Sequence, residues 1–178
     1  VITGKGKGNA EFADPWAAFA ALNSLGLFYL DRGEFEKASP LCKRAVAICE
    51  KIPESAGHPK FAICLNNLGL TELGLEKFTE AEAHFQQALA ILEKTRGKEH
   101  RQYGKVLGNL GGLRKAQGQF AKSEDLLKRA VSIQSKALGP EHPELAHALD
   151  RLASLYQSQG RYAEAEPLFK QALDIWVK

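Results

Sequence analysis

Apolar residues recur every three to four positions along most of the chain. The segment LDRLASLY places Leu149, Leu152 and Tyr156 at i, i+3 and i+7, which is the stripe of an amphipathic helix rather than the alternation of a strand. A second stripe of this period follows in GRYAEAEPLFKQALDI, residues 160–175. Gly160, between the two, is suited to end a helix and permit a tight reversal. The pattern predicts two antiparallel helices.

The same helix pair occurs four times. The first helices contain LNSLGLFY (22–29), LNNLGLTE (65–72), LGNLGGLR (107–114) and LDRLASLY (149–156). The second helices begin with GEFEKASPLCKRAVAI (33–48), EKFTEAEAHFQQALAI (76–91), GQFAKSEDLLKRAVSI (118–133) and GRYAEAEPLFKQALDI (160–175). Because one such pair cannot bury both of its apolar faces, neighbouring pairs must stack. The sequence therefore predicts an all-α solenoid of four repeats and eight helices.

A histidine precedes the first helix in three of the four repeats. His58, His100 and His142 are spaced by 42 residues, and proline follows two of them. Proline is favoured at the first helical position, because the N–H it lacks would have no partner there. Histidines one repeat apart would be separated by about 10 Å, whereas metal ligands lie about 2 Å from their ion. We expect these histidines, and Asp14 in the first repeat, to cap helices rather than bind metal.

Composition narrows the class of protein. The 178 residues are 44% hydrophobic and 25% charged, as in a folded soluble chain. A formal net charge of +3, with the charges interspersed, is too mild to indicate a nucleic-acid partner. No apolar run approaches the ~18 residues that span a bilayer. Three cysteines without C-x-x-C favour a reducing, cytoplasmic compartment. No catalytic constellation and no cofactor site is recognisable, so we expect no enzyme.

The chain is expected to contain one folded domain. Residues 1–13 include GKGKG, which lacks the spacing of a phosphate-binding loop, and we expect a disordered leader or an expression remnant. Residues 14–178 are expected to form one domain, with repeats at approximately 14–57, 58–99, 100–141 and 142–178. Because the chain begins at Val1 rather than Met, we expect it to be part of a longer protein.

The recurring residues resemble the tetratricopeptide repeat. In the first repeat the pattern is carried by Leu25-Gly26, Tyr29, Gly33 and Phe35. The period of about 42 residues, together with LNNL and LGPEHP, is similar to the longer variety found in kinesin light chains. The resemblance implies a right-handed α-solenoid that serves as a general peptide-binding scaffold.

The resemblance also implies where a ligand lies, because the first helices of such arrays line a concave face. The groove residues expected on this basis are Asn23, Asn66, Asn67, Lys105, Gly108, Asn109, Gly112, Lys115, His147 and Arg151. Asparagine offers both donors and an acceptor to a peptide backbone. In kinesin light chains the matching LNNL asparagines contact cargo peptide, so Asn66 and Asn67 inherit this role by resemblance. The alternative is that both are merely solvated.

Charge and glycine content suggest what the groove accepts. Lys105, Lys115, His147 and Arg151 make its C-terminal half basic, which favours an acidic partner or a free C-terminal carboxylate. Gly108 and Gly112, one turn apart, are expected to leave a dent for a bulky partner side chain, rimmed by Asn66, Lys105 and Asn109; the alternative is simply a weak helix.

One position departs from the repeat pattern. Tyr29 and Tyr156 are matched by Glu72 in the second repeat and Arg114 in the third. An isolated buried charge is costly and an opposite neighbour offsets much of the penalty. We therefore expect Glu72 and Arg114 to pair.

Three functions remain open from the sequence. The first is a module that binds a protein or peptide segment. The second is the sensor or scaffold arm of a larger regulated enzyme, such as a protease or a nucleotide-binding switch. The third is self-association through the uncapped C-terminal helix, where Ile175, Trp176 and Val177 would expose an apolar edge.

Overall fold

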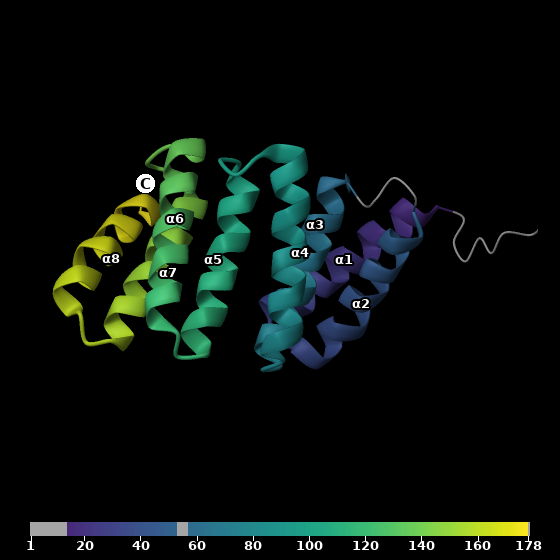
Figure 1. Ribbon diagram of the computed structural model, residues 1–178, viewed down its shortest axis with the longest axis horizontal. Helices are drawn as coiled ribbons and strands as arrows, with labels where there is room; N and C mark the ends of the chain where they lie inside the picture. Colours follow the sequence, from purple (N-terminus) through teal and green to yellow (C-terminus); the bar gives the residue numbers. More distant parts are fainter. Residues whose placement is uncertain (1–13, 53–56, 178) are drawn as a thin grey trace, which may run out of the picture.

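The computed structural model describes residues 14–52 and 57–177, and these form a row of eight helices (Figure 1). The helices are α1 (Pro15–Asp31), α2 (Phe35–Lys51), α3 (Pro59–Gly74), α4 (Phe78–Arg96), α5 (Arg101–Ala116), α6 (Phe120–Leu138), α7 (Pro143–Ser158) and α8 (Tyr162–Trp176). The α1–α2 pair and α8 lie at opposite ends of the row. The expected leader, 1–13, lies outside the described residues.

Each helix pair is closed by a residue in the left-handed region. Gly33, Gly118 and Gly160 have φ of 71°, 72° and 73°, and Glu76 takes the same role in the second repeat with φ of 58°. Glycine is favoured there because it has no Cβ to clash with the carbonyl oxygen. The expectation that Gly160 permits the reversal is confirmed.

The repeated histidines are helix caps, as expected. Nδ1 of His58, His100 and His142 accepts a hydrogen bond from the backbone N–H two residues later, at 3.1, 3.2 and 3.1 Å. Asp14 caps α1 through Oδ1, which accepts from the N–H groups of Trp16 and Ala17. A cap of this kind satisfies a helix N–H that has no intrahelical partner.

Capping by a neutral histidine makes stability depend on pH. Desolvation and, after it, the charges of Arg96 and Arg101 lower the pKa of His100. As pH falls below about 6.5, the unfolded chain therefore binds a proton before the folded chain does. The contribution of His100 is present above this pH and is lost below it. We expect the urea-unfolding midpoint to fall between pH 7.5 and 5.5, and to fall less in His100→Asn, which caps without titrating. An equal fall in both proteins would contradict this assignment.

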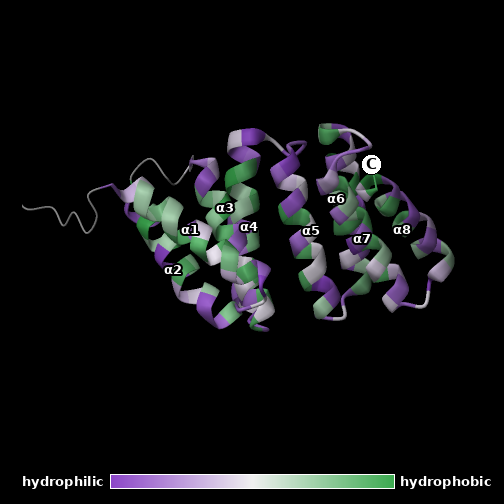
Figure 2. Cartoon of the chain, turned by 180° about the vertical axis from the view of Figure 1, so that it is seen from behind, coloured by the Kyte–Doolittle hydropathy of each residue, from purple (hydrophilic) through white to green (hydrophobic). Residues whose placement is uncertain are grey.

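Each helix buries only part of its surface. Hydrophobic and hydrophilic patches alternate along the helices in the view from behind (Figure 2), as expected of stacked amphipathic helices. Close approach within a pair uses small residues: a Cβ on Gly69 would lie 2.7 Å from Cε1 of Phe85, which is fully buried. No described helix is both long enough and apolar enough to cross a membrane.

The three cysteines, Cys42, Cys49 and Cys64, lie in the buried core. Burial raises the pKa of each thiol, that of Cys49 to about 11. Because the thiolate is the reactive species, these cysteines pack as small apolar residues and stay protonated at neutral pH.

The expected pairing of Glu72 with Arg114 is wrong. Glu72 is buried, and its Oε2 lies 2.6 Å from Nδ1 of His84 on α4 of the same repeat. Arg114 instead donates from Nη1 to Oε2 of Glu82 at 2.9 Å and from the same atom to Gln117. We call the first helix of each repeat (α1, α3, α5 and α7) its inner helix and the second (α2, α4, α6 and α8) its outer helix. Each charge therefore finds its partner on the outer helix α4, not on the neighbouring inner helix.

Candidate binding groove

The inner helices α1, α3, α5 and α7 line three adjoining cavities. The volumes are about 160, 350 and 380 Å³. Lys105 and Glu144 line both the first and the second, and Leu70 and Arg151 line both the second and the third. The three cavities therefore form one groove, which we call the inner groove. All ten site residues expected from the sequence come from these four helices.

A chain of side-chain hydrogen bonds runs across the four inner helices. Arg151 on α7 donates from Nη1 to Oδ1 of Asn109 on α5. Asn109 donates from Nδ2 to Oδ1 of Asn66 on α3, at 2.5 Å. Asn66 donates to Oδ1 of Asn67 at 3.4 Å, and Asn67 donates to Oδ1 of Asn23 on α1 at 2.9 Å. We call these five residues the asparagine ladder.

The repeat register explains the ladder. Each inner helix contains an L-x-x-L segment, at 22–25, 65–68, 107–110 and 149–152. At two junctions the third residue of this segment donates to the second residue of the segment in the preceding repeat. These pairs are Asn67 to Asn23 and Asn109 to Asn66. At the last junction the second residue is Gly108, which has no side chain to accept. Arg151 is longer than asparagine, and it reaches Asn109 instead.

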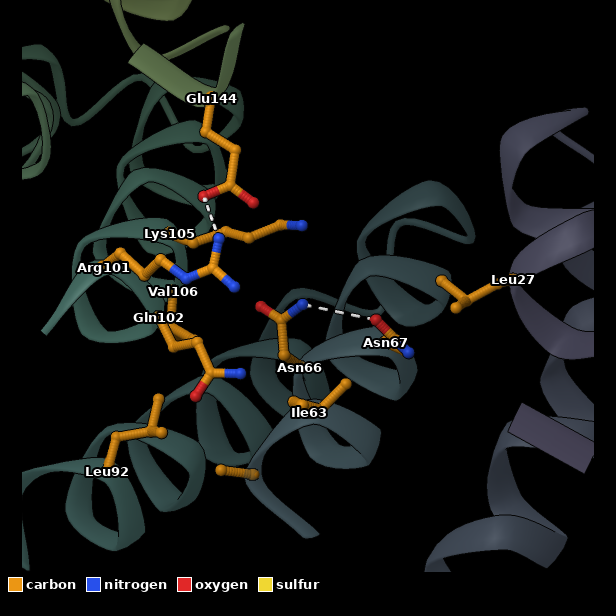
Figure 3. Close-up of a pocket in the computed structure, with 11 residues that line it drawn as sticks. Leu27, Ile63, Asn66, Asn67, Leu92, Arg101, Gln102, Lys105, Val106 and Glu144 are labelled. Atoms are coloured by element: carbon orange, nitrogen blue, oxygen red, sulfur yellow. Dashed lines mark hydrogen bonds and ion pairs between the residues drawn. The ribbon is translucent and has the colours of Figure 1, made fainter. Parts of the chain in front are cut away.

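Burial defines the role of the ladder asparagines. Asn66, Asn67 and Asn109 are all buried, which excludes the alternative that Asn66 and Asn67 are merely solvated. Asn66 and Asn67 line the first two cavities and Asn109 lines the third, with Asn66 and Asn67 side by side in Figure 3. Since buried amides are costly unless they are hydrogen-bonded, the ladder holds the inner helices in one register.

The two groove glycines have different surroundings. A Cβ on Gly108 would lie 3.6 Å from Nη1 of Arg151, so the guanidinium occupies part of the expected dent. A Cβ on Gly112 would meet nothing within 4 Å, so the dent is open there. Helix α5 runs unbroken from Arg101 to Ala116 through both glycines. Docking of a partner side chain in this dent stays a prediction.

The four basic residues expected in the groove have different surroundings. Lys115 donates from Nζ to the backbone oxygen and the hydroxyl of Ser154 on α7, at 3.0 and 2.7 Å, and desolvation lowers its pKa. His147 packs edge-on against Trp176, with ring centroids 4.8 Å apart. Desolvation lowers the pKa of Arg151 as well, although the residue as a whole is exposed. Lys105 is exposed and has no hydrogen bond or ion pair within 14–52 and 57–177.

Acidic side chains in the groove are few. Glu144 faces Arg101, with Nη1 3.7 Å from Oε2, as the upper dashed line in Figure 3 shows. Asp31 lines the second cavity and Asp150 the third. With Glu144 paired, Lys105 and Arg151 give the middle of the groove a basic character.

Gln134 is one of the groove residues that the sequence analysis did not predict. Gln134 comes from the outer helix α6 and is buried, yet it lines the second cavity and its Oε1 has no hydrogen-bond partner in the described residues. It reaches this place beside Gly104, where a Cβ would lie 3.2 Å from Cγ of Gln134. A signal existed in the sequence: the equivalent positions are Cys49, Leu92 and Trp176, so glutamine breaks an apolar series.

Comparisons with known proteins agree with this architecture. A family model described as the tetratricopeptide repeat matches residues 17–94, 60–134 and 102–176 in overlapping segments. No curated protein matches the chain.

Several solved structures have the same fold. One contains nearly identical TPR-like repeats, assigned as a kinesin light chain, from Podosopora anserina; it is 28% identical, with a TM-score of 0.74 over 93% of this chain and 78% of that one. BtubC (BKLC) from P. vanneervenii is 23% identical, with a TM-score of 0.76 over 95% and 67%. Aspartyl phosphate phosphatase F from Bacillus subtilis is 17% identical, with a TM-score of 0.74 over 92% and 41%. The predicted all-α solenoid of four repeats is confirmed.

Proposed function

Because this chain belongs to the tetratricopeptide-repeat family, a family of non-catalytic scaffolds whose repeats generally mediate protein–protein interaction, we propose that the inner groove binds an extended segment of a partner protein. The segment carries acidic side chains or a free C-terminal carboxylate. The observation that carries this proposal is Lys105, an exposed cation without a partner in the described residues, on the wall of a groove whose lining also includes Asn66 and Asn67.

The ladder supports the proposal in an indirect way. An asparagine side chain has two N–H donors, and Nδ2 of Asn66, Asn67 and Asn109 each makes one hydrogen bond within the ladder. A second N–H on each has no ladder partner. Because the three residues are at most 5% exposed, only the part of each that lines a cavity could reach a peptide carbonyl. Oε1 of Gln134 is buried at the second cavity without a partner in the described residues, and it would accept a peptide N–H once the side chain turns toward the groove. An extended segment presents both groups at regular intervals, so its backbone complements this lining.

Charge gives the segment its preferred sequence. Lys105 and Arg151 line the same cavity, and neither is paired with an acid among the described residues. A carboxylate there gains charge-assisted hydrogen bonds from both. Because Lys105 is exposed, part of this attraction is screened by salt.

Reversing the charge of Lys105 tests the proposal. Peptides selected from a display library on this chain should be enriched in acidic residues, and Lys105→Glu should weaken their binding by about tenfold or more. Lys122→Glu is the matched control, because Lys122 is exposed on α6 outside the groove. We expect this control to change affinity by less than about twofold. Binding is measured by isothermal titration at low and at physiological salt.

Equal effects of the two variants would place the binding site elsewhere. Peptides without acidic residues that bind indifferently to Lys105→Glu would contradict the proposed charge preference while leaving the groove as a site. Loss of binding in Arg151→Leu together with retention in Lys105→Glu would contradict the role given to Lys105.

A further inference from the structure

The two ends of the solenoid expose large apolar side chains. On α1, Leu25 is 44% exposed and Phe28 is 54% exposed. On α8, Leu173 is 58% exposed and Trp176 is 46% exposed. These helices lie at opposite ends of the row (Figure 1). Exposed apolar side chains that cluster on one face are typical of interaction surfaces.

We call the surface of α1 that carries Leu25 and Phe28 the α1 face, and that of α8 with Leu173 and Trp176 the α8 face. The equivalent surfaces of the later repeats show how another helix covers an α1 face. The residues equivalent to Leu25 are Leu68, Leu110 and Leu152, and those equivalent to Phe28 are Thr71, Leu113 and Leu155. Each of these six residues is at most 7% exposed. In every case the first helix of the repeat packs on the second helix of the preceding repeat. The α1 face is therefore a complete stacking surface without a preceding repeat in the described residues.

The earlier repeats show the same for α8. The residues equivalent to Trp176 are Cys49, Leu92 and Gln134, and those equivalent to Leu173 are Val46, Leu89 and Val131. Four of these residues are buried, and the remaining two, Leu89 and Val131, are half-buried. The first helix of the next repeat packs against each of these second helices, and Gln134 also lies beside Gly104 of its own repeat and lines the inner groove. The α8 face is thus the complementary half of the same kind of contact.

The internal junctions identify which residues meet. At the first junction, Thr71 Oγ1 lies 3.7 Å from Cys42 Sγ. At the third junction, Leu155 and Leu127 belong to one buried cluster. By register, Thr71 and Leu155 correspond to Phe28, and Cys42 and Leu127 correspond to Phe169 on α8. A pair of Phe28 and Phe169 would occupy the same place between two copies. The internal pairs already differ in volume, from Cys42 with Thr71 to Leu127 with Leu155.

The α8 helix also repeats the polar contact that is made at the third junction. At the third junction, Tyr156 donates its hydroxyl hydrogen bond to Oε1 of Glu124 at 3.1 Å, and Lys128 Nζ lies 2.7 Å from that oxygen. The equivalents of Glu124 and Lys128 on α8 are Glu166 and Lys170, which form the same ion pair at 2.7 Å. The equivalent of Tyr156 on α1 is Tyr29. The α8 edge therefore already holds a carboxylate where a tyrosine from α1 would be received.

From this complementarity we infer that the α8 face of one copy of this chain binds the α1 face of a second copy, continuing the solenoid from molecule to molecule. The occupant is a second copy because its α1 carries leucine, phenylalanine and tyrosine at the positions that the internal junctions use. Such a head-to-tail contact uses two different surfaces and does not close on itself, so it builds linear chains of copies. This inference is independent of the peptide-binding function proposed for the inner groove.

Two complementary variants test the inference. Phe28→Glu removes the α1 face and leaves α8 intact, whereas Leu173→Glu removes the α8 face and leaves α1 intact. Sedimentation velocity from about 10 µM to about 1 mM should show the average mass of the unaltered chain rising with concentration. Each variant alone should stay monomeric, and an equimolar mixture should form dimers that grow no further. Ala83→Glu, at an exposed position of α4, is the control and should assemble like the unaltered chain.

Each other outcome overturns the inference. An unaltered chain that stays monomeric over this range has no second copy as its partner. Dimers of Phe28→Glu alone would show that α8 binds α8, a symmetric contact. A mixture that stays monomeric, although circular dichroism shows both variants folded, would show that the two faces do not bind each other.

Discussion

Replacing Asn109 with alanine is expected to lower the free energy of unfolding by about 2 kcal/mol. Asn109 is 1% exposed and stands inside the asparagine ladder, between Arg151 and Asn66. Its loss leaves Oδ1 of Asn66 buried without a donor and removes the acceptor of Arg151. A stranded buried polar group costs its full desolvation, whereas the better helix propensity of alanine returns about 0.5 kcal/mol. Urea unfolding followed by circular dichroism measures the difference.

Asn23 supplies the control for this prediction. It lies at the other end of the ladder, is half-buried and has one ladder partner, Asn67. Because water can reach this end, Asn23→Ala should cost less than about 1 kcal/mol. Equal losses in the two variants would show that position in the ladder does not matter, and that the ladder is no more than four separate contacts.

Gly69→Ala is expected to destabilise the protein by about 2 kcal/mol. A Cβ on Gly69 would lie 2.7 Å from Cε1 and 2.9 Å from Cδ1 of Phe85. The ring of Phe85 is fully buried in the main core, so it has no free direction in which to move. Overpacking then outweighs the roughly 1 kcal/mol that alanine gains over glycine in a helix. The measurement is again the urea-unfolding free energy.

Gly112→Ala has the same change in helix propensity without the clash. A Cβ at this position meets nothing within 4 Å, so the variant should be stabilised by up to about 1 kcal/mol. We therefore expect the free energy of unfolding to fall in Gly69→Ala and to rise in Gly112→Ala. Destabilisation by Gly112→Ala would mean that a side chain here strains α5, and stabilisation by Gly69→Ala would mean that α3 and α4 can separate at little cost.

Local signals in the sequence predicted most of the fold. The helices, the four-fold repeat and the caps depend on spacing within one or two turns. His58, His100 and His142 cap helices because each is followed by helical residues whose first N–H groups lack partners. Gly160 turns the chain because its own backbone permits positive φ. Such features require no knowledge of the neighbouring repeat.

Contacts between helices were harder to predict. Glu72 and Arg114 occupy equivalent positions in adjacent repeats, and opposite charge suggested a pair. Equivalent positions are one full repeat apart, however, and a nearer partner stands on an outer helix in each case: His84 for Glu72 and Glu82 for Arg114. Equivalent positions in the repeats show on which face of its helix a residue lies. Its partner is the nearest suitable side chain within the length of that residue's own side chain, whichever helix carries it.

The inner groove shows a similar division. The sequence identified its asparagines and cations, but not that the asparagines bind one another or that Arg151 reaches Asn109 past Gly108. Gln134 was missed because only the first helices of the repeats were expected to line the groove. The absence of a side chain at Gly104 allows it to approach the groove. In both cases a glycine without a side chain leaves space into which a residue of a neighbouring helix extends, Arg151 at Gly108 and Gln134 at Gly104.

The most direct test of the proposed binding site is a nuclear magnetic resonance titration of the labelled chain with an acidic peptide selected on it. Binding in the inner groove should shift the side-chain amide signals of Gln134 and Asn109 and the backbone amide of Lys105. The side-chain amide of Gln86, exposed on the outer helix α4, should stay unchanged. Shifts confined to Gln86 and other outer-helix residues, with Gln134 and Lys105 unmoved, would contradict the assignment of the inner groove as the site of protein recognition.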